Sequence, residues 1–176
     1  SPQARFELRQ GFARDLFGWI ADDALDVALV TPPGQQWTGI GWRQFVEQRL
    51  LVAVPRNHRL AGREAVKAAD LDGEDFIAFA RSTELRTVID PMLQAAGAQV
   101  RIAFESSEID TIRGLVGAGL GVAIIPAPST TDASDPVYVP LVPVQARRLG
   151  LAWSTQRANP DSVVAFLDRS AAVRLD

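Results

Sequence analysis

The 176-residue chain contains no cysteine and a single histidine, His58. Without cysteine it can form no disulfide, and it offers neither a thiol nucleophile nor a thiolate metal ligand. A transition-metal site would depend on carboxylates alone, and no spacing in the sequence suggests one. A Ser-His-Asp triad would have to use His58, which lies in a predicted turn beside Arg56 and Arg59. We therefore expect no catalytic residue, no metal and no cofactor, and we interpret His58 as a surface or hinge residue.

Long apolar runs and an excess of positive charge are also missing. No apolar run approaches the roughly 20 residues that span a bilayer, and the chain does not open on a signal-peptide pattern. We expect no membrane partner, and the lack of cysteine mildly favours the cytoplasm. The formal net charge is −3, so the composition does not indicate a nucleic-acid-binding surface. The apolar fraction of 47% and the charged fraction of 22% are typical of a globular protein with a core.

Short apolar runs alternate with segments of helical spacing, which predicts an α/β fold with mostly parallel sheets. Prolines at 140 and 143 make the segment 137–144 look like an edge strand. Strands are predicted over residues 5–9, 25–30, 50–54, 75–79, 100–104, 120–125, 137–144 and 149–153, and helices over residues 12–21, 65–71, 82–96, 107–117 and 161–173.

The stretch from Phe104 to Pro126 carries the clearest succession of signals. Ser106 and Ser107 are good helix N-caps, and Ser107 with Asp110 approximates a capping box. An apolar stripe follows, and then a run of glycines leads into a buried strand that ends at Pro126. The glycine run follows a helix and enters a strand, which is the reverse of the dinucleotide fingerprint, so we reject a nucleotide site. The stripe consists of Ile109, Ile112, Leu115 and Val116.

A second capped helix start is predicted at Ser82 and Thr83. Ser82 is the expected N-cap, and Gly97 stands where a C′ glycine ends a helix. Pro91 either kinks this helix or restarts it with Asp90 as a new N-cap.

The hydroxyl residues at these two helix starts can be interpreted as structural caps or as ligand contacts, and the two roles are compatible. A helix N-terminus attracts anions through its free N–H groups and the helix dipole. Two such starts, each after a strand, make an anion pocket plausible. Thr31 follows another buried strand and is a weaker candidate, since threonine is common in turns. Pro126 would form part of the pocket wall.

Five segments, taken in order, point to one family. The sharpest match is Glu105 to Pro126, which is similar to the pattern E…TI…LVxAGLGVxxLP. The others are residues 25–30 (like LDxAL/IV), 51–61 (like LVxVPxxHPLA), 76–77 with 82–86 (like FI…S…LR), and 151–153 with 165–167 (like a closing strand and helix). Over nearly its whole length the chain resembles the effector-binding domain of LysR-type transcriptional regulators.

The resemblance implies two Rossmann-like lobes joined by two crossover segments, as in type 2 periplasmic binding proteins. Lobe one would comprise residues 1–54 and 143–176, and lobe two residues 55–142. Arg59 stands where the family usually has proline, which we interpret as a turn variation. The family's first strand and helix of lobe one, and its winged helix-turn-helix, have no counterpart, and no methionine opens the chain. We expect a fragment or an excised domain.

The resemblance also implies a function that is not enzymatic. A small, carboxylate-like effector would bind between the lobes, contacted by residues drawn from both. The chain would form a homodimer or higher homo-oligomer and would reach DNA only through the absent domain. A stand-alone solute-binding protein of a transporter is the alternative, and a small α/β hydrolase is disfavoured because no Gly-x-Ser-x-Gly elbow is present. The expected contacts are Ser82, Thr83, Ser106, Ser107, Thr31 and Pro126.

Overall fold

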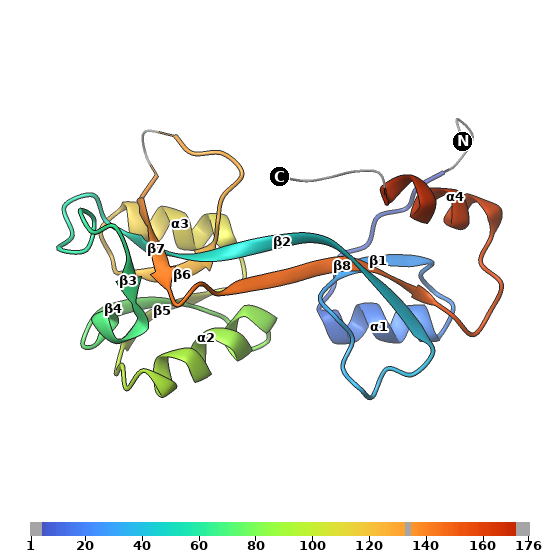
Figure 1. Cartoon of the computed structure of the whole chain (residues 1–176), viewed down its shortest axis with the longest axis horizontal. Coiled ribbons are helices and arrows are strands. Elements are labelled where there is room, and N and C mark those ends of the chain that lie inside the picture. Colours follow the sequence, from blue (N-terminus) through green and yellow to red (C-terminus); the bar gives the residue numbers. More distant parts are fainter. Residues whose placement is uncertain (1–4, 133–134, 172–176) are drawn as a thin grey trace. The chain divides into compact units, whose positions relative to one another are not determined.

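The computed structural model describes residues 5–132 and 135–171, which belong to two compact units (Figure 1). Unit 1 comprises residues Ser1–Glu47 and Arg148–Asp176, and unit 2 comprises Gln48–Arg147. The neighbouring strands β2 (Ile40–Val54) and β8 (Ala146–Ser154) contribute residues to both units. The units divide within these two strands, whereas the lobe boundaries predicted from the sequence follow residues 54 and 142.

In unit 1, helix α1 (Ala13–Ala21) packs on a short antiparallel pair of strands. Strand β1 (Val27–Val30) pairs with β8, so that Ala28 lies opposite Ala152. Phe17 and Ile20 lie three residues apart, on one face of α1, and are buried against this side of the pair. The helix predicted over residues 12–21 is confirmed.

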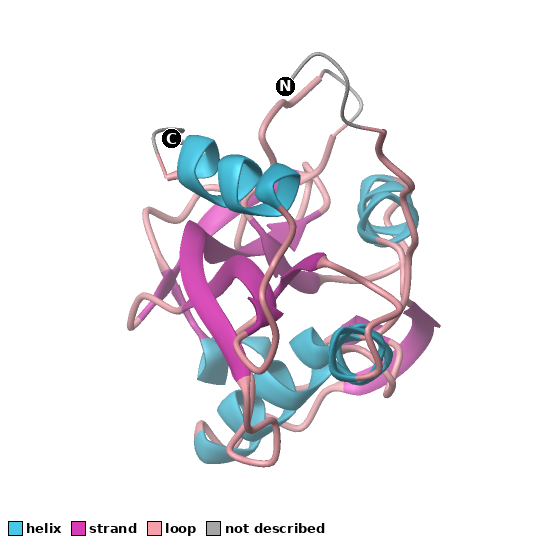
Figure 2. Cartoon of the chain, turned by 90° about the vertical axis from the view of Figure 1, so that its right-hand side faces the viewer, coloured by secondary structure: helices cyan, strands magenta, loops and turns pink. Residues whose placement is uncertain are grey.

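Helix α4 (Asp161–Ser170), one of the helices coloured cyan in Figure 2, covers the opposite side of the same strands. Val163 and Leu167, one helical turn apart, are buried against Leu151, which points away from α1 because successive strand residues face opposite sides. Val164 and Phe166 flank the buried stripe and are 45% and 39% exposed. The predicted helix end near residue 173 lies outside the described residues.

Residues 5–9 do not form the strand that their alternating pattern predicts. Phe6 is 72% exposed and Leu8 is 92% exposed, so the alternation buries no continuous face. In the part of the chain that the structure describes, no ladder joins this segment to a strand. A strand without a partner leaves its backbone groups unsatisfied. The Phe6 ring instead meets Phe166 edge to face, with the ring centroids 6.0 Å apart.

Unit 2 contains a mixed sheet. Strands β4 (Asp75–Phe79) and β5 (Arg101–Ser106) are parallel neighbours. The segment leading into β6 (Ala123–Pro126) joins β4 through a parallel bridge between Phe76 and Val122. β2 pairs antiparallel with β6, so β2 is antiparallel to β4, β5 and β6.

The remaining strands of unit 2 correct two predictions. β7 (Val137–Val142) lies between β2 and the two-residue β3 (Val66–Lys67), so it is not an edge strand. β3 pairs only with residues 141 and 142, so its ladder does not extend to Pro140. The sheets are also less parallel than predicted, since β2 is antiparallel to both of its partners in unit 2 and β1 is antiparallel to β8.

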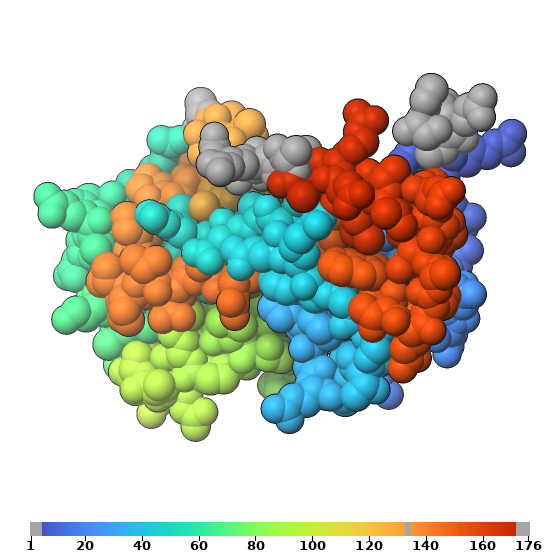
Figure 3. Space-filling model, turned by 45° about the vertical axis from the view of Figure 1, so that its right-hand side comes forward, coloured from blue at the N-terminus to red at the C-terminus, as the bar shows by residue number. Residues whose placement is uncertain are grey.

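Two helices follow β4 and β5 and cover the sheet of unit 2. Helix α2 (Glu84–Ala95) continues through Pro91, and Gly97 ends it with φ +70°, as predicted. Helix α3 (Ile109–Gly117) packs its predicted apolar stripe on the core. The other side of α2, coloured yellow-green in Figure 3, is exposed. In place of the helix predicted over residues 65–71, β3 leads into a 3₁₀ turn, η1 (Ala68–Leu71).

Gly121 permits the close approach of β4 to the segment before β6. Its φ is +154°, and a Cβ atom here would lie 2.6 Å from the carbonyl oxygen of Asp75. That carbonyl accepts a hydrogen bond from the Val122 N–H at 2.8 Å. Any larger residue would force these two backbones apart.

Candidate functional site

The carboxyl ends of β4 and β5 lie side by side in unit 2. Phe79, the last residue of β4, is in register with Ser106, the last residue of β5, and the Ala80 N–H donates to the Ser106 carbonyl at 2.9 Å. A short connection leads from each strand into a helix, with Thr83 as N-cap of α2 and Glu108 as N-cap of α3. Ligands of open α/β sheets bind beyond the carboxyl ends of the strands, and helix N-termini there attract anions.

The N-cap of α2 is Thr83, and the prediction that Ser82 takes this position is wrong. Both the N–H and the hydroxyl of Thr83 donate to the Ala80 carbonyl, at 2.9 and 2.7 Å. This pair of bonds fixes a turn at residues 80–83 and delays the helix by one residue. The Thr83 hydroxyl donates backwards, so α2 has no side-chain cap hydrogen bond. Ser82 is exposed in the turn.

The start of α3 corrects a second prediction, because neither Ser106 nor Ser107 is its N-cap. Pairing with Phe79 holds Ser106 in β5, so the helix cannot begin until Glu108 has taken an extended conformation. The Ser106 hydroxyl accepts a hydrogen bond from the Glu108 N–H at 3.1 Å, and Ser107 is exposed.

The predicted capping box between Ser107 and Asp110 does not form. Asp110 instead pairs with Arg113 one turn later, at 3.1 Å. Like α2, α3 has no side-chain cap hydrogen bond. The first-turn N–H groups of both helices are therefore left for water or a ligand.

Arg86 joins both strand ends to α2. The site predicted from the sequence did not include this residue. Its guanidinium is buried and donates to the Phe79 carbonyl at 2.6 Å, to Glu105 at 2.7 Å and to both carboxylate oxygens of Asp90 at 2.6 and 2.7 Å. Burial alone would lower the Arg86 pKa, but the hydrogen bonds to Glu105 and Asp90 more than offset it and the pKa is raised. Arg86 thus fixes the first turns of α2 against the strand ends.

The two remaining predicted contacts occupy different units. Pro126 is buried at the carboxyl end of β6, opposite Leu50 of β2, and lies in unit 2 with the four hydroxyl residues. Thr31 is buried directly after β1 in unit 1. Its membership of the site stays a prediction.

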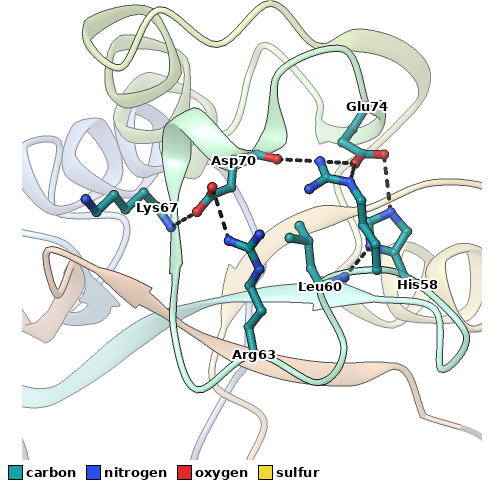
Figure 4. A network of polar contacts seen from close by, with 7 residues as sticks. His58, Leu60, Arg63, Lys67, Asp70 and Glu74 are labelled. Carbon is teal, nitrogen blue, oxygen red and sulfur yellow. Dashed lines mark hydrogen bonds and ion pairs between the residues drawn. The ribbon is translucent and has the colours of Figure 1, made fainter.

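His58 has a structural environment that accounts for it. In Figure 4 the ring lies between Glu74 and the backbone of Leu60: Nε2 is 3.2 Å from a Glu74 oxygen, and Nδ1 accepts from the Leu60 N–H at 3.3 Å. Arg59 joins the same carboxylate at 2.6 Å. With both ring nitrogens engaged in this way, His58 fastens the turn after β2 to the residue before β4.

Two features are absent from the described residues. Across residues 5–132 and 135–171, no helix has the length and apolarity needed to cross a membrane. Within the same ranges, no group of three or more histidine, aspartate or glutamate side chains is arranged to hold a metal ion.

Comparison with known proteins identifies the fold. The effector-binding domain of QuiR, solved in complex with shikimate, superimposes with a TM-score of 0.82 at 22% identity, over 94% of this chain and 81% of that one. The regulatory domain of CcmR from Synechocystis PCC6803, solved in complex with 2-PG, gives a TM-score of 0.83 at 19% identity over the same shares of the two chains. The fold is therefore that of effector-binding domains related to type 2 periplasmic binding proteins.

The sequence comparison identifies the family. The profile described as "LysR substrate binding domain" matches residues 1–174, so the chain belongs to this family. A relative in Bacillus subtilis (strain 168), the HTH-type transcriptional regulator YybE, is 31% identical over 153 residues, which are 86% of this chain and 52% of that protein. The chain spans about half the length of the curated relatives it matches.

Proposed function

We propose that the chain is the ligand-sensing regulatory domain of a bacterial LysR-type transcriptional regulator. The full protein would contact DNA through a separate domain and would act in the cytoplasm, where its DNA target lies. Membership of the family supports this proposal, as does the description of relatives such as YybE as HTH-type regulators. The same relatives argue against an enzyme and against the solute-binding protein of a transporter.

The proposed ligand is a small anionic effector held by unit 2 at the start of α2 and α3. The observation that carries this proposal is that two helix N-termini without side-chain caps meet at one strand edge, beside the hydroxyls of Thr83 and Ser106. The N–H groups and helix dipoles would bind the anion, and the two hydroxyls would orient it. We retain Ser82, Ser107, Thr31 and Pro126 as predicted neighbours. Shikimate, the ligand in the QuiR structure, is a carboxylate of this kind.

Such an effector would regulate by population shift. It changes the balance between two arrangements of the domain only to the extent that it binds them with different affinity. A hundredfold difference in affinity, for example, shifts the equilibrium by about 2.7 kcal/mol. Because no bond of the effector is made or broken in this scheme, it requires no catalytic group.

A homodimer would use the exposed edge of unit 2. β5 pairs with β4 on one side, and five of its six residues are exposed. Ile102 and Phe104 on this strand are 44% and 43% exposed, and Val88 on α2 is 38% exposed. An edge strand with large apolar residues favours pairing with another chain. The partner we propose is a second copy of this chain.

The test of the effector site is a binding screen on the purified domain. Small carboxylates, including shikimate, are assayed by thermal shift and then by calorimetry. We expect at least one to bind, and Thr83→Val and Ser106→Ala each to weaken it about 5- to 10-fold, because each removes a hydrogen bond worth about 1 kcal/mol. Thr87→Val is the matched control, since its hydroxyl lies one turn further along α2 and donates to the Glu84 carbonyl.

Two results would contradict the proposal. If no carboxylate stabilises the domain, the anionic effector is wrong. If a carboxylate binds Thr83→Val and Ser106→Ala as tightly as it binds Thr87→Val, the site lies elsewhere.

A further inference from the structure

Arg147 is a half-buried cation that has no acidic partner among the residues that the structure describes. It lies on β8 within unit 2, and its Nε donates to the Gln48 side-chain oxygen at 2.8 Å, from the neighbouring strand β2. No carboxylate of residues 5–132 or 135–171 lies within ion-pair distance of its guanidinium. The Gln48 contact engages Nε, and within the described ranges neither Nη group has a counter-ion.

Two other sheltered guanidiniums of the described residues do have acidic partners. Arg86 pairs with Asp90 and Glu105, and Arg113 pairs with Asp135 at 2.5 Å. Removing a cation from water is costly unless an anion compensates, and an unpaired buried charge is rare for this reason. Arg43 is also half-buried and has no acidic partner in the described part of the chain, but one of its Nη groups donates to the Leu167 carbonyl and the Ser170 hydroxyl. Among the described residues, Arg147 has only the Gln48 contact at Nε.

The electrostatics of Arg147 show the same imbalance and relate it to α2. Burial lowers the Arg147 pKa, and the carboxylate of Glu84 raises it without restoring the ordinary value. Glu84 is the first residue of α2, directly after the N-cap Thr83. The field of the residue that opens α2 thus reaches Arg147.

We propose that Arg147 is the counter-ion of the effector: its two Nη groups receive a carboxylate as a bidentate fork, and Gln48 holds Nε so that the fork faces the ligand. A guanidinium fits a planar carboxylate with two parallel N–H···O bonds, whereas an ammonium offers only a point charge. The inference deepens the proposed function and rests on it. It adds a specific cation to a site described so far by dipoles and hydroxyls, and it restricts the ligand class to carboxylates and similar oxyanions.

The test compares two substitutions that change the charge equally. Arg147→Gln removes the proposed counter-ion, and Arg148→Gln removes the exposed neighbour, which points to the opposite face of β8. The probes are succinate with succinamide and shikimate with methyl shikimate, so that each carboxylate has an uncharged partner. We expect Arg147→Gln to weaken carboxylate binding about 50-fold or more, since two charge-assisted hydrogen bonds are lost. Arg148→Gln should change it less than about 2-fold.

A measurement without ligand separates binding from structure. If Arg147 is reserved for a ligand, the ligand-free Arg147→Met protein unfolds at the same temperature as the wild type or above it, because a desolvated unpaired charge has gone. If Arg147 supports the fold, the unfolding temperature falls by several degrees and the inference is overturned. The inference alone also fails if carboxylates bind the wild type and Arg147→Gln equally. If no probe binds the wild type, the proposed function itself fails.

Discussion

Replacing Arg86 by methionine should destabilise unit 2 substantially. The side chain joins the end of β4, the end of β5 and the first two turns of α2 through Phe79, Glu105 and Asp90. Methionine has a similar length and fills most of the same space, so the change removes polar contacts without opening a large cavity. The substitution should also increase thermal motion at the start of α2.

The expected loss can be worked from the exposure of each partner. The side chains of Asp90 and Glu105 are 47% and 41% exposed, so water replaces much of each ion pair, and we assign about 0.5 to 1 kcal/mol to each. The Phe79 carbonyl belongs to a residue that is 2% exposed, and leaving it unpaired costs about 1 to 2 kcal/mol. The free energy of unfolding should therefore fall by about 2 to 4 kcal/mol.

Urea unfolding followed by circular dichroism measures this loss. With a slope of about 1 to 3 kcal/mol per molar urea, the midpoint should fall by about 1 M or more. Arg81→Met is the control, because Arg81 is exposed on the turn before α2 and carries the same charge. If the two variants differ by less than about 1 kcal/mol in free energy of unfolding, the argument from burial of Arg86 is wrong.

Two further predictions concern acid stability and assembly. Hydrogen bonds from Arg113 and from the Asp132 backbone hold the pKa of Asp135 below its usual value, so its stabilising effect is complete at neutral pH and is lost as the pH falls through that lowered pKa. Asp135→Asn should therefore be less stable than the wild type at pH 7. Chemical unfolding between pH 7 and 3 should show that the difference in free energy of unfolding between the two proteins shrinks below about pH 4. A difference that stays constant over this range would contradict the pairing of Asp135 with Arg113. Phe104→Ser should weaken the homodimer about tenfold or more in sedimentation experiments, because buried apolar area is lost. Phe166→Ser, on the exposed side of α4, should leave the dimer affinity unchanged. Equal effects of the two substitutions would place the interface elsewhere.

The elements that depend on local pattern were predictable from the sequence. The strand over residues 75–79 is β4 residue for residue, and the apolar stripe of α3 is buried as its spacing indicates. The ending of α2 at Gly97 also follows from local chemistry, since glycine takes the left-handed conformation there at little cost. The family motifs lie on these same elements, and the profile match confirms the family.

The features that depend on distant partners were not predictable in the same way. Ser106 looks like a helix cap until its register with Phe79, 27 positions earlier, places it inside a strand. The spacing of Arg86 and Asp90 is visible in the sequence as an i, i+4 pair, but the contacts with Glu105 and the Phe79 carbonyl require the folded sheet. The strand predicted over residues 5–9 was wrong for the opposite reason: the local pattern is good, but among the described residues this segment has no strand to pair with.

Unit 2 is one continuous segment, Gln48–Arg147, and this continuity matters during protein synthesis. A ribosome adds these hundred residues in about 5 to 20 seconds, and every strand that pairs within the segment is available when it ends. Unit 1 is in a different position, because β1 must wait for β8, about 120 residues later, before Ala28 can meet Ala152. The nascent chain can therefore complete the edge at which α2 and α3 begin while the older N-terminal strand is still unpaired. Chaperones that recognise exposed apolar strands would meet β1 during that interval.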